Sequence, residues 1–391
     1  MGCVRLGRSA DLKSLVVLGV TGSIGLQTLD VARQLGLEVV GMAARRGSPE
    51  MIELARQWPD ASVAVSDPDE AARRACTDAL GPRVDFGLDA VDALAATPGA
   101  IVVNGIVGAA GLRPSMAAAA AGNRLALANK ESLVAGGDVL SAALAASDAE
   151  IIPVDSEHSA LWQCLVGEAA GVRRLILTAS GGPFRGRSRE DLAAVSVADA
   201  LNHPTWAMGS RITIDSSTLM NKAFEVIEAH YLFGADYDDI DVVVHPQSII
   251  HSMVEFVDGS VKAQLGDPDM RLPIQYAITY PERAVSAERR FDITKQDLTF
   301  ESPDTTVFRL LELGYAAGRQ AGSAPAVLNA ADEVAVAAFL EGRIGYLDIE
   351  AVVEHCLLTV EWRPMNSVED VLAVDAEARA AAGGRVAATS R

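Results

Sequence analysis

The sequence predicts an α/β fold with a helical C-terminal part, and three observations support this expectation. Short apolar segments of strand-forming residues alternate with helical segments through about the first 150 residues, which is typical of a doubly wound parallel sheet. Only 5% of the residues are aromatic, and much of the 50% hydrophobic content is Ala, which favours helix-rich α/β packing over a β-sandwich. From Leu311 onward the apolar periodicity is helical. A length of 391 residues suggests two or three domains.

The overall composition excludes several classes of protein. The 33 Lys and Arg residues face 52 Asp and Glu residues, a formal net charge of −19, so general affinity for nucleic acid or anionic membrane is not expected. The longest apolar stretches, such as 101–112, fall short of the ~20 residues of a membrane span. Four scattered cysteines without a CxxC pair signal neither a disulfide framework nor a thiolate zinc site. No secretory leader is visible, so we expect a cytoplasmic protein that begins with a loose extension at residues 1–13.

The first element is a strand followed by a glycine turn and a helix. After the apolar run 15–20, Gly19, Gly22 and Gly25 are spaced three apart and open an apolar-periodic helix that reaches Leu35. In Rossmann-like domains such glycines let backbone N–H groups approach a pyrophosphate at the helix N-terminus. A tight turn without a ligand is the alternative interpretation of the same residues.

The second strand, 38–44, ends about twenty residues after the glycines, where this fold places the group that reads the adenosine ribose. The sequence offers Arg45 and Arg46 there instead of an acid. Guanidinium groups suit a 2′-phosphate, which favours NADPH over NADH. The alternative is a pair of solvated arginines in a loop.

Further strands are expected at 62–65, 100–103 and 124–128, which continues the parallel sheet. The last of them ends in the polar cluster 129–132, where the carboxyl edge of the sheet should meet a ligand. Lys130 could contact an anion or a carbonyl oxygen there. An ordinary surface lysine is the alternative.

Two carboxylates follow the next apolar segment, 150–155. In an extended chain Asp155 and Glu157 would point to the same side, and two hard oxygen ligands so placed select Mg²⁺ or Mn²⁺ over zinc. The alternative is a helix N-cap formed by Asp155 or Ser156.

Hydroxyl and amide groups suited to an anion lie further along the chain. A strand at 175–178 ends at Ser180 beside two glycines, and the loop 203–209 carries Trp206. A strand is expected at 211–215, and Ser216 then begins a helix. On that helix Asn221 and Glu225 are four residues apart and share a face, with Lys222 adjacent.

Two other kinds of site find no support in the pattern. His245 and His251 are six residues apart, which is not a zinc spacing, so core or supporting roles are expected for them. A nucleophilic serine is also disfavoured because no GxSxG motif occurs.

The C-terminal part is expected to be a small helical bundle. The polar segment 286–310 is expected to be a connector. Helices are expected at 331–340 and 349–360, the second with Asp348 as its N-cap. The last segment starts near Ser367 and is expected to dissolve into a disordered tip after Ala380.

In combination, eight strings of the sequence resemble the family of 1-deoxy-D-xylulose 5-phosphate reductoisomerases. They are GVTGSIG (19–25), LANKES (127–132), PVDSEHSA (153–160), SGGPFR (180–185), HPTWAMG (203–209), DSSTLMNKAFEVIEA (215–229), HPQSIIHSMVEF (245–256) and LNAADEVAVAAFLEGRIGY (328–346). The resemblance implies an NADPH-dependent enzyme of non-mevalonate isoprenoid biosynthesis. Such an enzyme rearranges 1-deoxy-D-xylulose 5-phosphate and reduces the aldehyde intermediate to 2-C-methyl-D-erythritol 4-phosphate. It also implies a homodimer and a divalent ion, Mg²⁺ or Mn²⁺, with Co²⁺ as a third candidate.

The resemblance further implies roles for individual residues, carried over position by position. The metal ligands would be Asp155, Glu157 and Glu225. The substrate would be bound by Lys130, Ser156, Ser180, His203, Ser216, Asn221 and Lys222, together with Glu157 and Glu225. NADPH would contact Thr21, Gly22, Ser23, Ile24, Asn129, Glu131 and Gly209. The catalytic set would be Lys130, Asp155, Glu157, Glu225 and His203, beneath a lid that carries Trp206.

One departure from the family pattern lies after the second strand, where some members have Gly-Lys-Asn and this chain has Arg45, Arg46 and Gly47. The basic character is retained, and we assign these three residues to cofactor binding as well.

The expected organisation is therefore a Rossmann-like NADPH domain at 14–152, a central α/β catalytic domain at 153–285, the connector and a helical domain at 311–391. Two rival functions stay open: an NADP-linked dehydrogenase of another phosphorylated substrate, without rearrangement, and a protein that senses NADPH without turnover. The first leaves the three carboxylates unexplained, and the intact carboxylate and Asn-Lys blocks argue against the second.

Overall fold

The computed structural model describes residues 14–168, 170–206, 208–285 and 291–389. The expected N-terminal extension at 1–13 and the first residues of the connector therefore lie outside the described residues. Among the described helices, none is long and apolar enough to cross a membrane.

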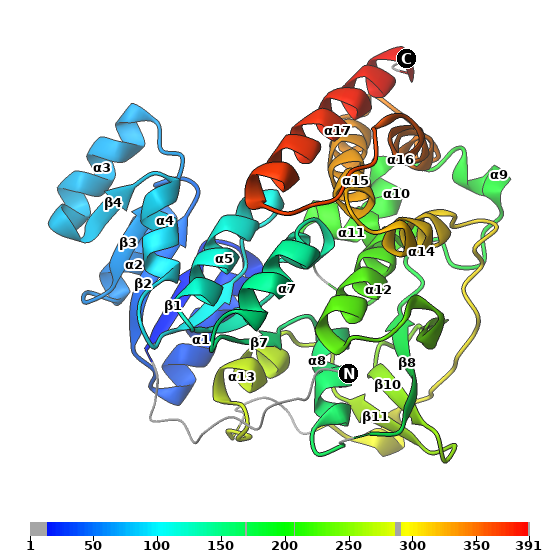
Figure 1. The fold of residues 1–391 in the computed structure, drawn as a ribbon, viewed down its shortest axis with the longest axis horizontal. Coiled ribbons are helices and arrows are strands. Elements are labelled where there is room, and N and C mark those ends of the chain that lie inside the picture. Colours follow the sequence, from blue (N-terminus) through cyan, green and yellow to red (C-terminus); the bar gives the residue numbers. More distant parts are fainter. Residues whose placement is uncertain (1–13, 169, 207, 286–290, 390–391) are drawn as a thin grey trace.

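The N-terminal part is built on a seven-stranded parallel sheet with the order β4-β3-β2-β1-β5-β6-β7, which confirms the doubly wound fold (Figure 1). The strands are β1 Leu15–Leu18, β2 Val39–Ala44, β3 Ser62–Val65, β4 Val84–Phe86, β5 Ile101–Asn104, β6 Arg124–Leu127 and β7 Glu150–Pro153. The helices between them are α1 Ser23–Leu35, α2 Pro49–Gln57, α3 Glu70–Leu80, α4 Leu88–Ala95, α5 Leu112–Ala120, α6 Glu131–Val134 and α7 Gly137–Ala145. Because helices cover the sheet on both faces, its central strands are entirely buried. The strand order reverses between β1 and β5, where ligands bind in folds of this kind.

The central part holds a four-stranded mixed sheet with the order β11-β10-β8-β9. Its strands are β8 Val172–Ala179, β9 Ile240–Val244, β10 Ile250–Phe256 and β11 Val261–Leu265. The helices are α8 Ser156–Leu165, α9 Arg189–Leu192, α10 Val197–Leu201, α11 Ser210–Thr218 and α12 Met220–Phe233. The long helix α12 is buried along most of its length and shares one hydrophobic core with β8 and the C-terminal helices.

After the central sheet, α13 (Arg271–Thr279) returns to the N-terminal sheet and packs beside α1 (Figure 1). Its Ile274 and Ala277 belong to the same buried cluster as Leu15 of β1. The Arg124 guanidinium of β6 donates to the carbonyl oxygen of Tyr280 at 2.6 Å. The first two parts of the molecule are therefore joined by packing as well as by the chain.

The C-terminal part is helical, as expected. It contains α14 Leu310–Gln320, α15 Ala324–Leu340, α16 Asp348–Thr359 and α17 Val368–Thr389. Helix α15 is buried over most of its surface and packs against α16, α17 and α11. Through these contacts the C-terminal part rests on the central part.

Four sequence-based expectations about elements are wrong. The helix that carries Asn221 and Glu225 begins at Met220 and not at Ser216, which lies inside α11, because Leu219 adopts a left-handed conformation with φ +63° between the two helices. The segment 211–215 is helical, within α11, because Ile214 and Ser217 bury a helix face that overrides the β-branched composition. The helix α17 continues beyond Ala380 to Thr389, since Ala378, Ala382 and Val386 repeat at four-residue spacing and are buried. Asp348 is the first residue of α16, whose N-cap is Leu347.

Candidate active site

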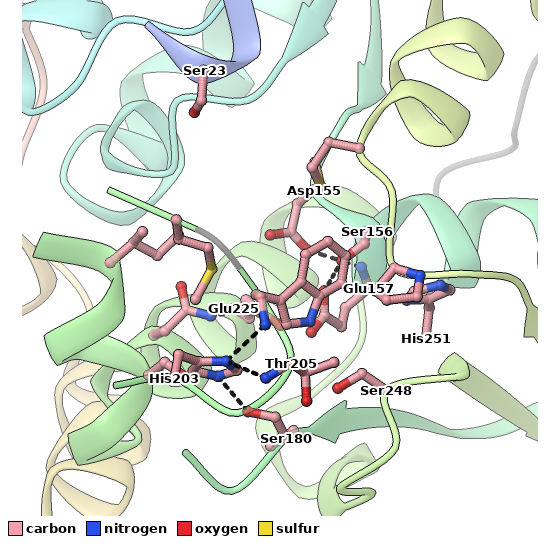
Figure 2. A pocket seen from close by; sticks show the side chains of 18 of the residues that line it. Ser23, Asp155, Ser156, Glu157, Ser180, His203, Thr205, Glu225, Ser248 and His251 are labelled. Carbon is pink, nitrogen blue, oxygen red and sulfur yellow. Dashed lines mark hydrogen bonds between the residues drawn. The ribbon is translucent and has the colours of Figure 1, made fainter. Parts of the chain in front are cut away.

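A cavity of about 590 Å³ lies between the carboxyl edge of the N-terminal sheet and the central part of the molecule. Figure 2 shows Ser23 of α1 on one side and Ser180 and His203 on the other, with the acidic residues between them. The predicted site residues that line it are Ser23, Ile24, Lys130, Asp155, Ser156, Glu157, Ser180, His203, Trp206, Gly209, Ser216, Asn221, Lys222 and Glu225. Residues from far-apart segments of the chain are thus brought to one space.

The glycine turn at the start of α1 requires residues without side chains. Gly19 has φ +79°, and a Cβ atom there would lie 2.7 Å from the carbonyl oxygen of Gly105. A Cβ atom on Gly25 would lie 2.4 Å from the carbonyl oxygen of Gly19. Gly22 caps α1 without a side-chain hydrogen bond, so the first N–H groups of this 13-residue helix remain available to an anion.

The other predicted cofactor contacts occupy different positions. Among the described residues, Thr21, Gly22, Arg45, Arg46, Gly47, Asn129 and Glu131 lie outside the cavity lining. The exposed Arg45 follows β2 and forms an ion pair with Asp67 at 3.2 Å. The side chain of Asn129 is buried and donates to the carbonyl oxygens of Ile106 and Gly108, at 2.7 and 3.0 Å. This amide therefore supports the loop after β5.

Three carboxylates form a compact cluster inside the cavity. One carboxylate oxygen from each of Asp155, Glu157 and Glu225 lies within 4.8 Å of the others. Asp155 is the N-cap of α8 and accepts from the backbone N–H groups of Glu157 and His158, at 3.0 and 3.3 Å. The expected extended geometry is therefore wrong, because Glu157 belongs to the first turn of α8. The N-cap and the acidic cluster, which the sequence presented as alternatives, occur together.

Two buried ammonium groups lie among these carboxylates. Lys222 contacts Glu157 at 2.8 Å and also donates to Glu225. Lys130 donates to Asp155 and lies 3.5 Å from Glu225. Lys130 is thus not an ordinary surface lysine. The Asn221 amide nitrogen donates to Glu225 at 2.6 Å, as expected from their shared helix face.

The pKa shifts of these residues show that the carboxyl groups need positive charge nearby in order to ionise. Burial, together with the neighbouring Asp155 and Glu157, raises the pKa of Glu225 to about 8, although Lys222 and Lys130 act in the opposite direction. Burial opposes ionisation of Asp155 too, but its pKa is lowered because Lys130, His158 and Lys222 lie close. The pKa of Lys222 is raised, since its carboxylate neighbours outweigh the effect of burial.

This donor set fits a divalent cation of the Mg²⁺ type. Three carboxylates supply hard oxygen ligands on two helices, and Mg²⁺ is usually bound by few protein carboxylates while it keeps water or substrate ligands. The carbonyl oxygen of the Asn221 side chain is buried and has no hydrogen-bond partner among the described residues. The site therefore also holds an unused oxygen acceptor beside the acids.

The opposite wall presents hydroxyl and imidazole groups. The Ser180 hydroxyl lies 3.0 Å from Nε2 of His203, and Nδ1 of His203 accepts from the backbone N–H groups of Thr205 and Trp206, at 3.1 and 2.9 Å (Figure 2). Since Nδ1 accepts, the proton of the neutral ring lies on Nε2, which donates to Ser180. Burial lowers the pKa of His203, which favours this neutral form.

Residues 203, 205, 206, 208 and 209 lie along one side of the cavity, and Trp206 is among them. The indole ring is half-buried and its centroid lies 6.2 Å from that of the His251 imidazole. Gly209 ends the loop and caps α11, from which Ser216 faces the cavity. The loop therefore covers the space between the glycine turn and the acidic cluster.

Sequence reasoning missed several residues of this site. Glu228 is buried one helical turn after Glu225 and lies 3.5 Å from Lys130, and burial raises its pKa to about 7. Nε2 of the buried His158 donates to the carbonyl oxygen of Glu225 at 2.9 Å. The spacing of three residues from Glu225 could have indicated Glu228. His251, expected in a core or supporting role, is buried and lines the cavity.

Comparisons with known proteins agree over most of the chain. The model of the 1-deoxy-D-xylulose 5-phosphate reductoisomerase family matches residues 15–137, the C-terminal domain of that enzyme matches 151–233, and the DXP reductoisomerase C-terminal domain matches 265–381. The chain is 50% identical over 374 residues to the 1-deoxy-D-xylulose 5-phosphate reductoisomerase of Chlorobium chlorochromatii, which covers 94% of this chain and 98% of that relative. It is also 50% identical to the enzyme of the same name from Xanthomonas campestris pv. campestris, over 95% of this chain and 96% of that relative.

Solved structures of reductoisomerases are also similar to this chain. A 1-deoxy-D-xylulose 5-phosphate reductoisomerase from Zymomonas mobilis in complex with NADPH has a TM-score of 0.88 at 40% identity, over 96% of this chain and 99% of that chain. A DOX-P reductoisomerase in complex with NADPH, fosmidomycin and magnesium has a TM-score of 0.91 at 38% identity, over 96% of this chain and 98% of that chain. Relatives this similar over nearly the full length confirm the resemblance seen in the sequence, and the chain belongs to the 1-deoxy-D-xylulose 5-phosphate reductoisomerase family.

Proposed function

We propose that this protein catalyses the NADPH- and divalent-metal-dependent conversion of 1-deoxy-D-xylulose 5-phosphate to 2-C-methyl-D-erythritol 4-phosphate, in non-mevalonate isoprenoid biosynthesis. One observation carries the proposal: a single cavity holds a three-carboxylate cluster, anion-binding groups and the N-terminus of a glycine-capped helix. A dehydrogenase of another phosphorylated substrate would have no use for the carboxylates. A protein that only senses NADPH would need neither the carboxylates nor Lys222 and Asn221.

Asp155, Glu157 and Glu225 would hold the metal ion. When bound, the ion would act as a Lewis acid on the carbonyl and hydroxyl oxygens of the substrate, which supports the breaking and rejoining of a carbon–carbon bond. The solved relative with magnesium supports Mg²⁺, and we extend the proposal to Mn²⁺ and Co²⁺ on the chemistry of the oxygen ligands. Lys130 lies beside Asp155, so its ammonium group is close enough to bind a substrate oxygen at the same centre.

The phosphate group of the substrate would be held by Ser180, His203, Ser216, Asn221 and Lys222. Their hydroxyl, imidazole, amide and ammonium groups all donate hydrogen bonds, which is what a phosphate accepts. Ser156 would complete the substrate contacts beside Glu157, to which its hydroxyl donates. Binding energy from the phosphate end would fix the reacting end of the substrate near the carboxylates.

NADPH would bind along the carboxyl edge of the N-terminal sheet. The turn Thr21 to Ile24 would hold the pyrophosphate of NADPH, and Arg45, Arg46 and Gly47 would lie toward its 2′-phosphate. The remaining family contacts, Asn129, Glu131 and Gly209, would bind the other end of the cofactor. When bound, the cofactor supplies the hydride that reduces the aldehyde. The loop with Trp206 would act as a lid that keeps water out of the cavity during that step.

The larger organisation is part of the same proposal. We assign the NADPH domain to 14–152, the catalytic domain to 153–285, the connector to 286–310 and the helical domain to 311–391, in a cytoplasmic homodimer. The packing of α13 on the N-terminal sheet adds a contact across the first of these boundaries.

The test is to follow NADPH absorbance with purified protein and 1-deoxy-D-xylulose 5-phosphate, before and after chelation of divalent ions. We expect oxidation of NADPH that stops on chelation and returns when Mg²⁺, Mn²⁺ or Co²⁺ is added. Metal-independent oxidation would contradict the proposed mechanism. NADPH binding without any turnover in the presence of metal would favour the sensor.

A further inference from the structure

The short helix α11 presents two different faces to two parts of the molecule. Its N-cap Gly209, together with Ile212 and Ser216, lines the cavity. Arg211 and Asp215 are four residues apart and lie on another face, where α11 packs against the C-terminal helix α15. A movement of this second face would therefore move the end of the Trp206 loop and Ser216 together.

The Arg211 guanidinium joins three parts of the molecule. Nη1 donates to Oε1 of Glu131 at 2.6 Å and to Oε1 of Glu333 at 3.1 Å. Nη2 donates to Oδ1 of Asn329, also at 3.1 Å. Glu131 begins α6 at the edge of the N-terminal sheet, whereas Asn329 and Glu333 belong to α15. One side chain of the central part thus connects the cofactor side to the C-terminal helices.

Each partner of Arg211 is itself fixed by further contacts. Glu131 accepts from the backbone N–H of Gly108 at 3.0 Å and from the Asn129 amide at 2.7 Å, so it ties together the loops that follow β5 and β6. Glu333 accepts from Arg379 of α17 at 2.5 Å. The contacts run without interruption from α17, through α15 and Arg211, to the edge of the sheet at which the proposed cofactor binds.

Several acidic side chains surround the guanidinium group of Arg211. The carboxyl groups of Glu131, Asp215, Asp332 and Glu333 all lie within 4 Å of it. Arg379 is the other cation of the group and is shared between Glu333 and Asp375. An arginine is suited to such a place because its planar group stays charged and donates in several directions at once.

We infer that Arg211 is a positioning residue for the reaction, through which the C-terminal helix α15 fixes the edge of the NADPH site and the end of the Trp206 loop. The inference rests on the proposed function, because it assumes that NADPH binds at that edge. Arg211 itself lies outside the cavity lining among the described residues, so it acts through Glu131 and through the start of α11.

The test uses Glu333→Gln, a substitution in the C-terminal part that removes one charged partner of Arg211 without touching the cavity. We expect the equilibrium Kd for NADPH, measured by fluorescence titration, to rise about fivefold, and that of Arg211→Gln to rise about tenfold. The double variant should match Arg211→Gln within twofold, because Glu333 acts through Arg211. Arg211→Lys keeps the charge beside Glu131 and should recover binding to within threefold of the original protein.

The matched control is Glu377→Gln, which breaks a different ion pair of the C-terminal part, with Arg363 at 2.6 Å. It should leave the Kd for NADPH unchanged. If Glu333→Gln lowers the thermal midpoint but leaves the Kd unchanged, as the control does, the contact is only structural and the inference is overturned. Should Arg211→Gln not fold, the Glu333→Gln and Arg211→Lys measurements decide. Failure of the unsubstituted protein to bind NADPH would overturn the proposed function as well, whereas normal binding and turnover with unaffected variants overturns this inference alone.

Discussion

At the scale of single residues, Glu225 shows how the acidic cluster is held. It is fully buried, accepts from Asn221 at 2.6 Å and contacts both Lys130 and Lys222. Its place on a helix face with Asn221 could be predicted from spacing alone. Lys222 is three residues from Glu225 on the same helix, so that contact was also within reach of spacing. The contacts of Lys130 with Glu225 and of Lys222 with Glu157 could not be predicted, because these residues meet only after distant segments have packed together. Spacing along the chain carries no information about such contacts.

Replacing Glu225 by Gln should abolish turnover while leaving the cofactor site intact. The amide keeps the shape of the side chain but loses the charge that the proposed metal site needs, and we expect kcat to fall by at least about 100-fold. The Kd for NADPH should stay within about twofold, because α1 and its glycine turn lie on the other side of the cavity. Steady-state kinetics and fluorescence titration measure the two effects.

The control for this change is Glu168→Gln, which removes an exposed partner of Lys262 and should leave both quantities unchanged. A folded Glu225→Gln protein with normal turnover would remove Glu225 from the proposed metal site.

His203 should make the order of the Trp206 loop depend on pH. Burial lowers the pKa of His203 below its ordinary value of about 6.5. The stability that the neutral ring contributes is therefore fully present above about pH 6.5 and is lost as the pH falls through the lower pKa of the folded protein. Protonated Nδ1 can no longer accept from Thr205 and Trp206, so the loop loses two hydrogen bonds.

The measurement is an NMR titration of the His203 ring together with the emission of Trp206 over the same pH range. We expect both to change with a common midpoint below pH 6.5. A His203 midpoint above 6.5, or an indole signal that ignores it, would contradict the assigned hydrogen bonds.

At the scale of elements, the sequence predicted the N-terminal strands closely except for β4, which it missed, and it failed at α11. Strand β1, the glycine turn and α1 lie where expected. Their residues pack against near neighbours in the sequence, so the local apolar pattern was enough to predict them. The segment 211–215 has the alternation and β-branched residues of a strand, yet it folds as a helix against α15. Its partner lies more than a hundred residues away, so local propensity could not identify it.

The same substitution should have opposite effects in two helices. Gly25→Ala would place a Cβ atom 2.4 Å from a carbonyl oxygen, which we expect to destabilise the protein by roughly 2–3 kcal/mol and to abolish NADPH binding. Gly384 lies exposed inside α17 with no atom within 4 Å of the added Cβ position. Gly384→Ala should stabilise by about 0.5–1 kcal/mol, because Ala favours the helix over Gly.

Chemical denaturation of both variants gives the comparison. A Gly384→Ala protein that is less stable than the original would mean that α17 is not a continuous helix at that position.

At the scale of the whole molecule, the order of the three parts was visible in the sequence but their packing was not. The return of α13 to the N-terminal sheet depends on Ile274 and Ala277 meeting Leu15, some 260 residues earlier by the numbering. The buried pair of Asp215 and Asp332 likewise joins α11 to α15. From the sequence alone, such acidic residues are predicted to lie on the surface, because charged side chains are rarely buried.

Removing one carboxyl of this pair should stabilise the protein at high pH. Burial raises the pKa of Asp215 to about 6, and burial together with Asp215 raises the pKa of Asp332 well above its ordinary range. The folded protein therefore keeps a proton that the unfolded chain has lost above about pH 4, so stability falls as the pH rises toward and beyond 6. Asp332→Asn removes this cost, and we expect a gain of roughly 1–3 kcal/mol at pH 8 that shrinks to near zero at pH 4.

Urea unfolding of both proteins at pH 4, 6 and 8 tests this expectation. A gain of equal size at all three pH values would show that the pKa of Asp332 is not raised in the folded protein.

The two ammonium groups within the acidic cluster allow the chain to fold before the proposed metal ion binds. In small zinc domains the ligands repel one another until the ion arrives, so the chain folds only when metal is bound. Here Lys130 and Lys222 form ion pairs with Asp155, Glu157 and Glu225 from within the chain, which offsets most of the repulsion among the three carboxylates. If the proposed metal site is correct, the chain can therefore reach its final packing before the ion binds, and the ion can bind, leave and bind again without refolding.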